Sequence, residues 1–328
     1  MKATRLAGAM AVLALSLHVW PARAAEEVAE GADAEAAELA KQLSNPVASL
    51  ISVPFQANED FNMGPTGNGY QFKLNFQPVI PISVSENWNL IIRTIVPYIS
   101  QHDVFYQEVP SYPGLPDDIL NRFPPDQRDA VNREGKRLYD QEIKKHPQNR
   151  SQDGLGDTTQ SFFLSPKKPG PGGLIWGLGP VFLYPTATQD LLGTGKFGLG
   201  PTFVGLVQKK GWTVGVLANQ IWSVAGNDDR QNVNSMFLQP FVSYTTKTHT
   251  SFTLNTESTY NWDDSQWTVP LNLMVSQVLR IGKQPVSIQL GARYYAETPS
   301  GGPEWGLRLN FTLLFPKKHE AAPHPDYK

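Results

Sequence analysis

The chain contains no cysteine among its 328 residues, so the sequence excludes a disulfide framework and any metal site with cysteine ligands. It also has no tract of basic residues, and its net charge is −2, which argues against a nucleic-acid partner. The six histidines are too dispersed along the chain to predict a metal site. We therefore predict neither a metal nor a cofactor.

Long hydrophobic runs are also scarce. Residues 6–20 are apolar and follow Lys2 and Arg5, and Ala22–Ala24 forms a small-x-small cleavage site, so residues 1–24 are predicted to be a secretory signal peptide. No later stretch approaches the roughly 20 apolar residues that a membrane helix needs. The mean hydropathy is −0.32. A barrel that crosses a membrane with strands gives such an average, because its lumen-facing residues are polar.

Aromatic residues stand ten positions apart at the two ends of four segments, the clearest being Trp88 with Tyr98 and Trp305 with Phe315. An even spacing places both rings on the same face of a strand. Ten residues tilted by about 40° climb about 25 Å, which is the height of the apolar band between the two aromatic girdles of an outer-membrane barrel. The predicted girdle residues are Trp88, Tyr98, Trp212, Trp222, Trp262, Trp267, Trp305 and Phe315.

Polar and apolar residues alternate with period two over much of the chain. Between Tyr70 and Ile80, one face is apolar and the other carries Gln71, Lys73 and Asn75. We predict about twelve such strands, at 47–57, 70–81, 88–99, 156–165, 174–186, 198–208, 212–223, 235–245, 251–262, 267–280, 286–297 and 305–315. In the strands at 156–165 and 198–208, the sequence does not decide which side chains point into the barrel. Bacterial single-chain barrels have an even number of strands, and twelve fits that rule. We therefore predict an all-β fold, an antiparallel up-and-down transmembrane barrel.

The connections and ends complete this expected layout. Residues 25–46 are rich in Ala and Glu and predict a short helix, which we interpret as a periplasmic arm rather than a plug. The barrel is expected over 47–316, with tight turns in the periplasm and longer loops outside. The long loop at 100–155 is predicted to be extracellular and to hold a helix that Gly135 weakens. Residues 317–328 are expected to be a periplasmic tail.

Two motifs point toward other functions, and neither carries much weight. The run from Gly193 to Gly198 matches G-x-G-x-x-G, but a strand is predicted after it where a dinucleotide site needs a helix. His249 and Ser251 have the His-x-Ser spacing of outer-membrane lipid hydrolases. They fall at a predicted periplasmic turn, whereas those enzymes work at the outer leaflet. We therefore predict that the protein is not an enzyme.

The best functional lead is a set of charged residues that alternation places inside the barrel. Cationic groups outnumber carboxylates in this set, and a confined cationic wall attracts anions. The alternative is that arginines and carboxylates pair across a narrow lumen and fill it. The predicted pore-lining residues are Lys73, Arg93, Glu257, Arg280, Arg293, Glu297 and Arg308.

Several segments of the chain also resemble a known family. They include ELAKQLSNPVASLISVPFQ, QPVIPISVSENWNLIIRTIVPYI, GLGDTTQSFFLSPK, GLGPVFLYPTAT, LANQIWSVAG, FLQPFVSYTT, LNTESTYNW and LLFPK. Together they resemble bacterial outer-membrane transporters similar to the channels of the meta-pathway of phenol degradation, which are sometimes mislabelled neuromedin U. The resemblance covers nearly all of residues 38–317, although the insert at 100–150 is longer than the family pattern. It implies a β-barrel and small-molecule uptake.

Three functions follow as hypotheses. The first is a channel in the outer membrane of a Gram-negative bacterium that admits small solutes, with a preference for anionic or aromatic compounds, by passive diffusion. The second is a structural or surface-binding barrel that does not conduct, and the third is a lipid hydrolase. The expected partners are outer-membrane lipid, a small-molecule solute and the barrel-assembly machinery.

Overall fold

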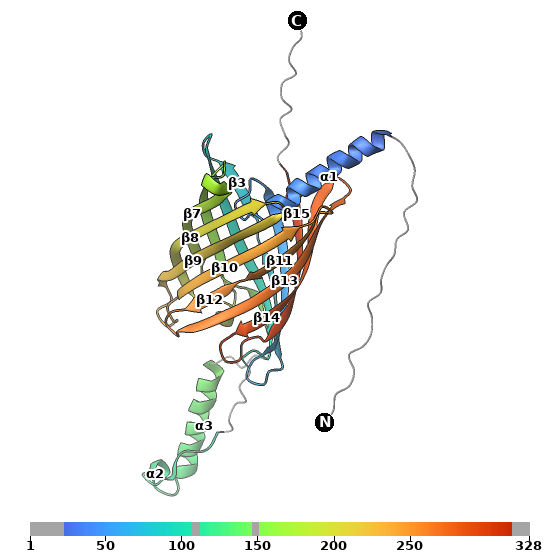
Figure 1. Ribbon diagram of the computed structural model, residues 1–328. Coiled ribbons are helices and arrows are strands. Elements are labelled where there is room, and N and C mark those ends of the chain that lie inside the picture. The colour runs from blue at the N-terminus through green and yellow to red at the C-terminus, as the bar shows by residue number, and fades with distance from the viewer. Residues whose placement is uncertain (1–22, 106–111, 146–150, 317–328) are drawn as a thin grey trace, which may run out of the picture. The chain divides into compact units, whose positions relative to one another are not determined.

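The computed structural model describes residues 23–105, 112–145 and 151–316 (Figure 1). The chain divides into two units, residues 1–35 and 36–328. The first unit contains the start of helix α1 (Arg23–Leu43), and the second contains its end and all the strands. The predicted tail at 317–328 and nearly all of the predicted signal peptide lie outside the described residues. None of the helices within the described ranges is both long and apolar enough to cross a membrane.

Within the described residues, fifteen strands form one antiparallel sheet that closes on itself (Figure 1). They are β1 (Ile51–Met63), β2 (Gly69–Phe76), β3 (Val79–Ser83), β4 (Trp88–His102), β5 (Ser151–Leu155), β6 (Thr158–Pro166), β7 (Leu174–Tyr184), β8 (Lys196–Lys209), β9 (Trp212–Gly226), β10 (Asn234–Thr245), β11 (Thr250–Thr256), β12 (Ser258–Asn261), β13 (Gln266–Ile281), β14 (Gln284–Glu297) and β15 (Trp305–Phe315).

Three of the barrel's spans are each made of two successive strands. β2 continues into β3 past Pro78, β5 continues into β6 past Gly156, and β11 continues into β12 past Glu257. The sheet therefore has twelve spans, and β15 closes it by pairing with β1 from Phe315 opposite Ile51 to Trp305 opposite Phe61. This confirms the prediction of a twelve-stranded barrel.

Side chains alternate between the two faces of this wall as period two requires. Along β15, Leu307 and Leu309 are about half exposed on the outer face, whereas Arg308 and Thr312 are buried on the inner face. All eight predicted girdle residues face outward. Trp88, Trp212 and Phe315 lie near the end of the barrel with tight turns, and the other five lie near the opposite end. The outer surface is thus an apolar band bordered by aromatic rings, as on outer-membrane barrels.

The connections make the two ends of the barrel different. At the short-turn end, strands join through residues 84–87, 167–173, 210–211, 246–249 and 282–283. Lys210 and Gly211 both have positive φ, +52° and +83°, which is the type I′ geometry of a two-residue hairpin. At the opposite end the loops cover 64–68, 103–150, 185–195, 227–233, 262–265 and 298–304. Short 3-10 turns lie within two connections, η1 (Pro171–Gly173) and η2 (Asp190–Leu192).

The longest connection contains two helices, α2 (Asp117–Leu120) and α3 (Arg128–Lys145). The second matches the helix expected there, and Gly135 has a packing role within it. A Cβ at Gly135 would stand 2.4 Å from the hydroxyl of Tyr112 and about 3 Å from Leu115. Asn132 holds the same segment, because its Oδ1 accepts hydrogen bonds from the Tyr112 hydroxyl and the Leu115 amide, each 3.0 Å long. The glycine thus permits a close approach of Tyr112 and Leu115 that a larger residue would block.

Because the chain lacks cysteine, introduced cysteines can test the facing of β15. We expect a spin label at Leu307→Cys or Leu309→Cys, in protein reconstituted into lipid, to be reached by oxygen and not by an aqueous nickel chelate. A label at Asn310→Cys should show the reverse preference, since that side chain faces inward. Equal accessibility at neighbouring odd and even positions would contradict the barrel described here.

Candidate functional site in the barrel lumen

The inner face of the barrel changes character in a fixed order from the long-loop end to the short-turn end. On β1 the inward residues run from Met63 through Asp60 and Asn58 to Gln56 and then Ser52. Gln71 and Lys73 of β2 follow the same order from the long-loop end, and Gln77 continues it between β2 and β3. The lumen therefore consists of an open mouth, a charged layer, a polar cavity and a plug.

The mouth at the long-loop end is a cavity of about 730 Å³. Its walls come from the loops around Gly64, Val104 and Gly301 and from Gln71 and Gln101 of the barrel. The Gln71 side-chain amide donates to Gln101 (2.7 Å), and Gln101 donates in turn to Gln152 (2.6 Å). This row of glutamines lines the approach to the charged layer with neutral polar groups.

The charged layer is held together by Arg308 from β15. Its guanidinium donates to both carboxylate oxygens of Glu257, at 2.8 and 2.7 Å, and its Nε donates to Asn58 Oδ1 at 2.7 Å. Only 2% of the Arg308 side chain is exposed. Bidentate pairing of this kind satisfies both ions in a site with little water. The pair also occupies space in the lumen.

A second ion pair lies in the same layer. Arg293 Nη1 stands 3.2 Å from Asp60 Oδ2, and Arg293 Nε donates to Asn272 Oδ1 at 3.1 Å. The guanidinium carbon also lies 5.2 Å from the ring centre of Tyr295. Lys73 is within electrostatic reach of Asp60, Glu257 and Arg293 and has no ion-pair partner in the described part of the chain. Two carboxylates thus face three cations here.

Below the charged layer lies a cavity of about 210 Å³, which we call the inner cavity. Arg93 of β4 lines it and donates from Nη2 to Gln77 Oε1 at 2.9 Å. Gln56, Gln239 and Asn310 contribute amides from three other strands. The far wall is formed by the chain just before β1, including Leu43, Ala48 and Leu50.

Residues 36–50, which we call the plug, fill the barrel at its short-turn end. Polar groups fix this segment to the wall: the hydroxyls of Ser44 and Thr213 lie 2.9 Å apart, and Asn89 donates to Ser49 Oγ at 2.8 Å. Gln208 donates to the backbone oxygen of Lys41 at 2.9 Å and to Ser44 Oγ at 3.0 Å. The sequence favoured an arm over a plug, and for residues 36–46 that expectation is corrected by these contacts with inward-facing side chains.

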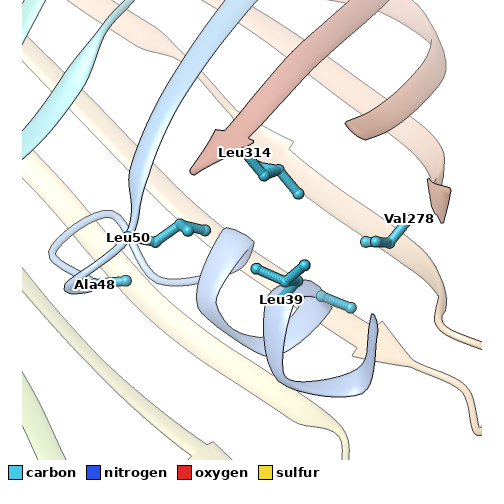
Figure 2. Close-up of a cluster of buried hydrophobic side chains, with 6 residues drawn as sticks. Leu39, Ala48, Leu50, Val278 and Leu314 are labelled. Carbon is cyan, nitrogen blue, oxygen red and sulfur yellow. The ribbon is translucent and has the colours of Figure 1, made fainter. Parts of the chain in front are cut away.

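Two apolar clusters explain why the plug stays inside. Leu39 and Ala40 from the end of α1 pack with Ala48, Leu50, Val278 and Leu314, and Figure 2 shows Leu39 among these side chains. On the other side, Val47 packs against Ile91, Phe163, Val204, Leu206 and Leu217, which all point inward. Burying leucine-sized side chains stabilises the plug by about 1.5–3 kcal/mol each.

Five of the seven residues predicted to line the pore face the lumen, namely Lys73, Arg93, Arg293, Arg308 and Glu257. Arg280 is instead exposed near the C-terminal end of β13, and Glu297 is exposed at the C-terminal end of β14. A bulge between Val269 and Pro270 shifts the register beside Glu297, so simple alternation fails there. Sequence reasoning missed Asn58 and Asp60, because the first strand was predicted to end at residue 57. Extending the period-two pattern past Gln56 would have found both.

The two competing motifs are part of the wall and its loops. Gly198 lies within β8, so a strand does follow the G-x-G-x-x-G run, as predicted. Asp157 organises the loop by accepting from the amide (2.6 Å) and the hydroxyl (2.7 Å) of Thr194. The hydroxyl of Ser251 lies 2.8 Å from that of Thr245 on the neighbouring strand.

Comparisons with known proteins support the fold. No protein-family model matches the chain, and no curated protein matches it in sequence. Among solved structures, an outer membrane channel from Pseudomonas putida F1 matches with a TM-score of 0.54 at 13% identity, covering 81% of this chain and 96% of that one. The β-domain of the Bordetella autotransporter BrkA aligns over 81% of this chain and 100% of its own, at 9% identity and a TM-score of 0.40. At such low identity the first of these likenesses shows a shared barrel fold.

The central ion pair gives a stability prediction. Glu257→Gln leaves the Arg308 guanidinium buried without its anion, so we expect the free energy of unfolding to fall by roughly 3–5 kcal/mol. Adding Arg308→Met should recover most of that loss, because the buried cation is removed. Glu297→Gln at the exposed rim is the matched control, with an expected change below about 0.5 kcal/mol. Urea titration of protein reconstituted in lipid measures all three, and a Glu257→Gln protein as stable as wild type would refute this role.

Proposed function

We propose that the protein is an outer-membrane channel that admits small solutes by passive diffusion and favours anionic ones, aromatic acids included. One observation carries the proposal: two cavities lie inside the barrel, on either side of a layer whose described residues include more cations than carboxylates. A confined surplus of positive charge concentrates anions and lowers their barrier to entry. The apolar outer band supports placement in a membrane that barrels occupy.

The charges around the layer can be followed one by one. Arg308 is neutralised by Glu257, and Arg293 lies beside Asp60. Lys73 and Arg93 have no ion-pair partner among the described residues. Lys73 lies within the layer, opposite Asn58, and Arg93 lines the inner cavity below it. These two side chains are therefore the positive charges that a passing anion would meet.

The plug sets the basal conductance in this proposal. Residues 36–50 hold the short-turn mouth by hydrogen bonds and by apolar contacts. Solutes then pass only when the segment shifts or leaves a narrow path beside it. The orientation, with short turns in the periplasm, remains a prediction, as do the signal peptide and the assembly machinery as a partner.

A second candidate is a barrel that does not conduct. Two observations favour it: the Arg308–Glu257 ion pair is buried in the lumen, and the plug packs against the barrel wall. Small barrels are often filled by their own side chains. Conductance and solute flux separate this candidate from a channel.

A disulfide between plug and wall tests the gating role. Ser44→Cys with Thr213→Cys replaces two hydroxyls that lie 2.9 Å apart, in a chain that has no other cysteine. We expect the oxidised protein to show several-fold lower conductance in planar bilayers than the same protein after reduction. The single Ser44→Cys variant should not respond to reductant. Identical currents before and after reduction would argue against a plug that gates, and no solute flux from folded wild-type protein would contradict the channel itself.

Selectivity is tested at Lys73. Lys73→Glu turns an inward positive charge into a negative one, so in a salt gradient the reversal potential should shift toward cation preference. Lys283→Glu lies in an exposed turn between β13 and β14 and should shift it much less. Equal reversal potentials for wild type and Lys73→Glu would show that the central charges do not select ions.

A further inference from the structure

Arg93 is a cation inside the barrel that has no ion-pair partner among the residues the structure describes. Its one hydrogen-bond partner in the described chain is the neutral Gln77, at 2.9 Å. Glu257 acts on Arg93 electrostatically, but both oxygens of that carboxylate already accept from Arg308. Placing a charge in such a setting is costly unless an opposite charge and hydrogen bonds compensate it. The inner cavity, which Arg93 lines, is the space where a compensating anion would sit.

The groups around Arg93 in this cavity have free hydrogen-bonding capacity. Within the described chain the side chain of Asn310 makes no hydrogen bond; its buried Oδ1 is an acceptor, so only its NH₂ group can contact an anion. Gln56 and Gln239 also line the cavity, and within the described chain their side chains make no hydrogen bond. A side-chain amide can donate through its NH₂ group, so this set can hold the oxygens of an anion alongside the guanidinium.

The plug gives the inner cavity a partly apolar wall. Leu43, Ala48 and Leu50 line it together with Gln42 and Asn45, and Val79 of β3 lies beside Arg93 on the neighbouring strand. The volume is about 210 Å³, larger than the roughly 150 Å³ apolar cavity that holds a benzene ring. A ligand with a charged end toward Arg93 and a small apolar body toward the plug matches both walls.

We infer that the inner cavity is a binding site for a small amphipathic monocarboxylate, with Arg93 as the group that holds its carboxylate. This inference rests on the proposed function and deepens it by naming the class of solute. An arginine fork matches the two oxygens of a carboxylate. The ligand's apolar body contacts residues of the plug, so its binding and the position of the plug are coupled.

Binding to purified full-length protein in detergent tests the inference without any need for conduction. Benzoate is the probe, benzamide is its neutral isostere, and inorganic phosphate is an anion without an apolar body. By isothermal titration calorimetry, we expect benzoate to bind at least tenfold more tightly than either. This comparison uses wild-type protein, so it holds even where a variant fails to fold.

Variants then assign the anion-binding role to Arg93. Arg93→Gln should remove the preference for benzoate over benzamide, and Arg93→Lys, which keeps the charge, should retain part of it. Arg280→Gln, an arginine exposed near the end of β13, is the matched control and should bind benzoate like wild type. Heat-modifiable migration on gels verifies that each variant is folded.

The outcomes separate the site from the channel. Equal affinity for benzoate and benzamide, phosphate binding as tight as benzoate, or an unchanged preference in Arg93→Gln would each overturn the site. Benzoate binding through Arg93 in a protein that passes no solute would leave the site standing and overturn the channel. Conductance without any preference for benzoate would leave the channel standing and overturn the site.

Discussion

The pairing of β1 with β15 is the contact on which the rest of the structure depends. In hydrocarbon, backbone N–H and C=O groups must be satisfied within the protein, and an open sheet would leave two unpaired edges. Closure joins the first strand to the last, and it brings Asn58 of β1 beside Arg308 of β15, with 2.7 Å between Oδ1 and Nε. The charged layer in the lumen therefore exists because the sheet closes in this register.

The small circumference of the barrel brings charged side chains of several strands together in the lumen. Glu257 lies between β11 and β12, whose neighbours toward β15 are β13 and β14, so the Arg308 guanidinium reaches across the lumen to its carboxylate. The attraction between the two ions offsets the free-energy cost of burying them, and their side chains narrow the lumen. Lys73 and Arg93 lie where that pairing is incomplete. The Arg308–Glu257 pair thus bridges separate strands of the wall, and the proposed channel assigns selectivity to Lys73 and Arg93, which have no ion-pair partner among the described residues.

Period two was enough to predict the wall, and it failed where a residue's role depends on distant chain. Alternation gave the facing of Lys73 and Arg308, because one face of those strands is polar. It was ambiguous in β8, where inward Val204 and outward Phe203 are both apolar and Val204 packs beneath the plug. The packing of Leu39 against Leu314 and Val278 could not be predicted from any short stretch of sequence. The three residues are far apart in the chain and meet only when the barrel closes. The sequence likewise could not predict that Arg93 has no ion-pair partner among the described residues, because Glu257 pairs with Arg308 only in the folded barrel.

The seating of Leu39 also has a consequence for how the protein is assembled. The plug precedes β1 in the chain, yet the contacts of Leu39 with Val278 and Leu314 come from β13 and β15, so this part of the plug is complete only when the last strand is in place. Contacts between residues so far apart in sequence are the slowest to form. The packing of Leu39 and the closure of the sheet by β15 therefore belong to the same late step of folding.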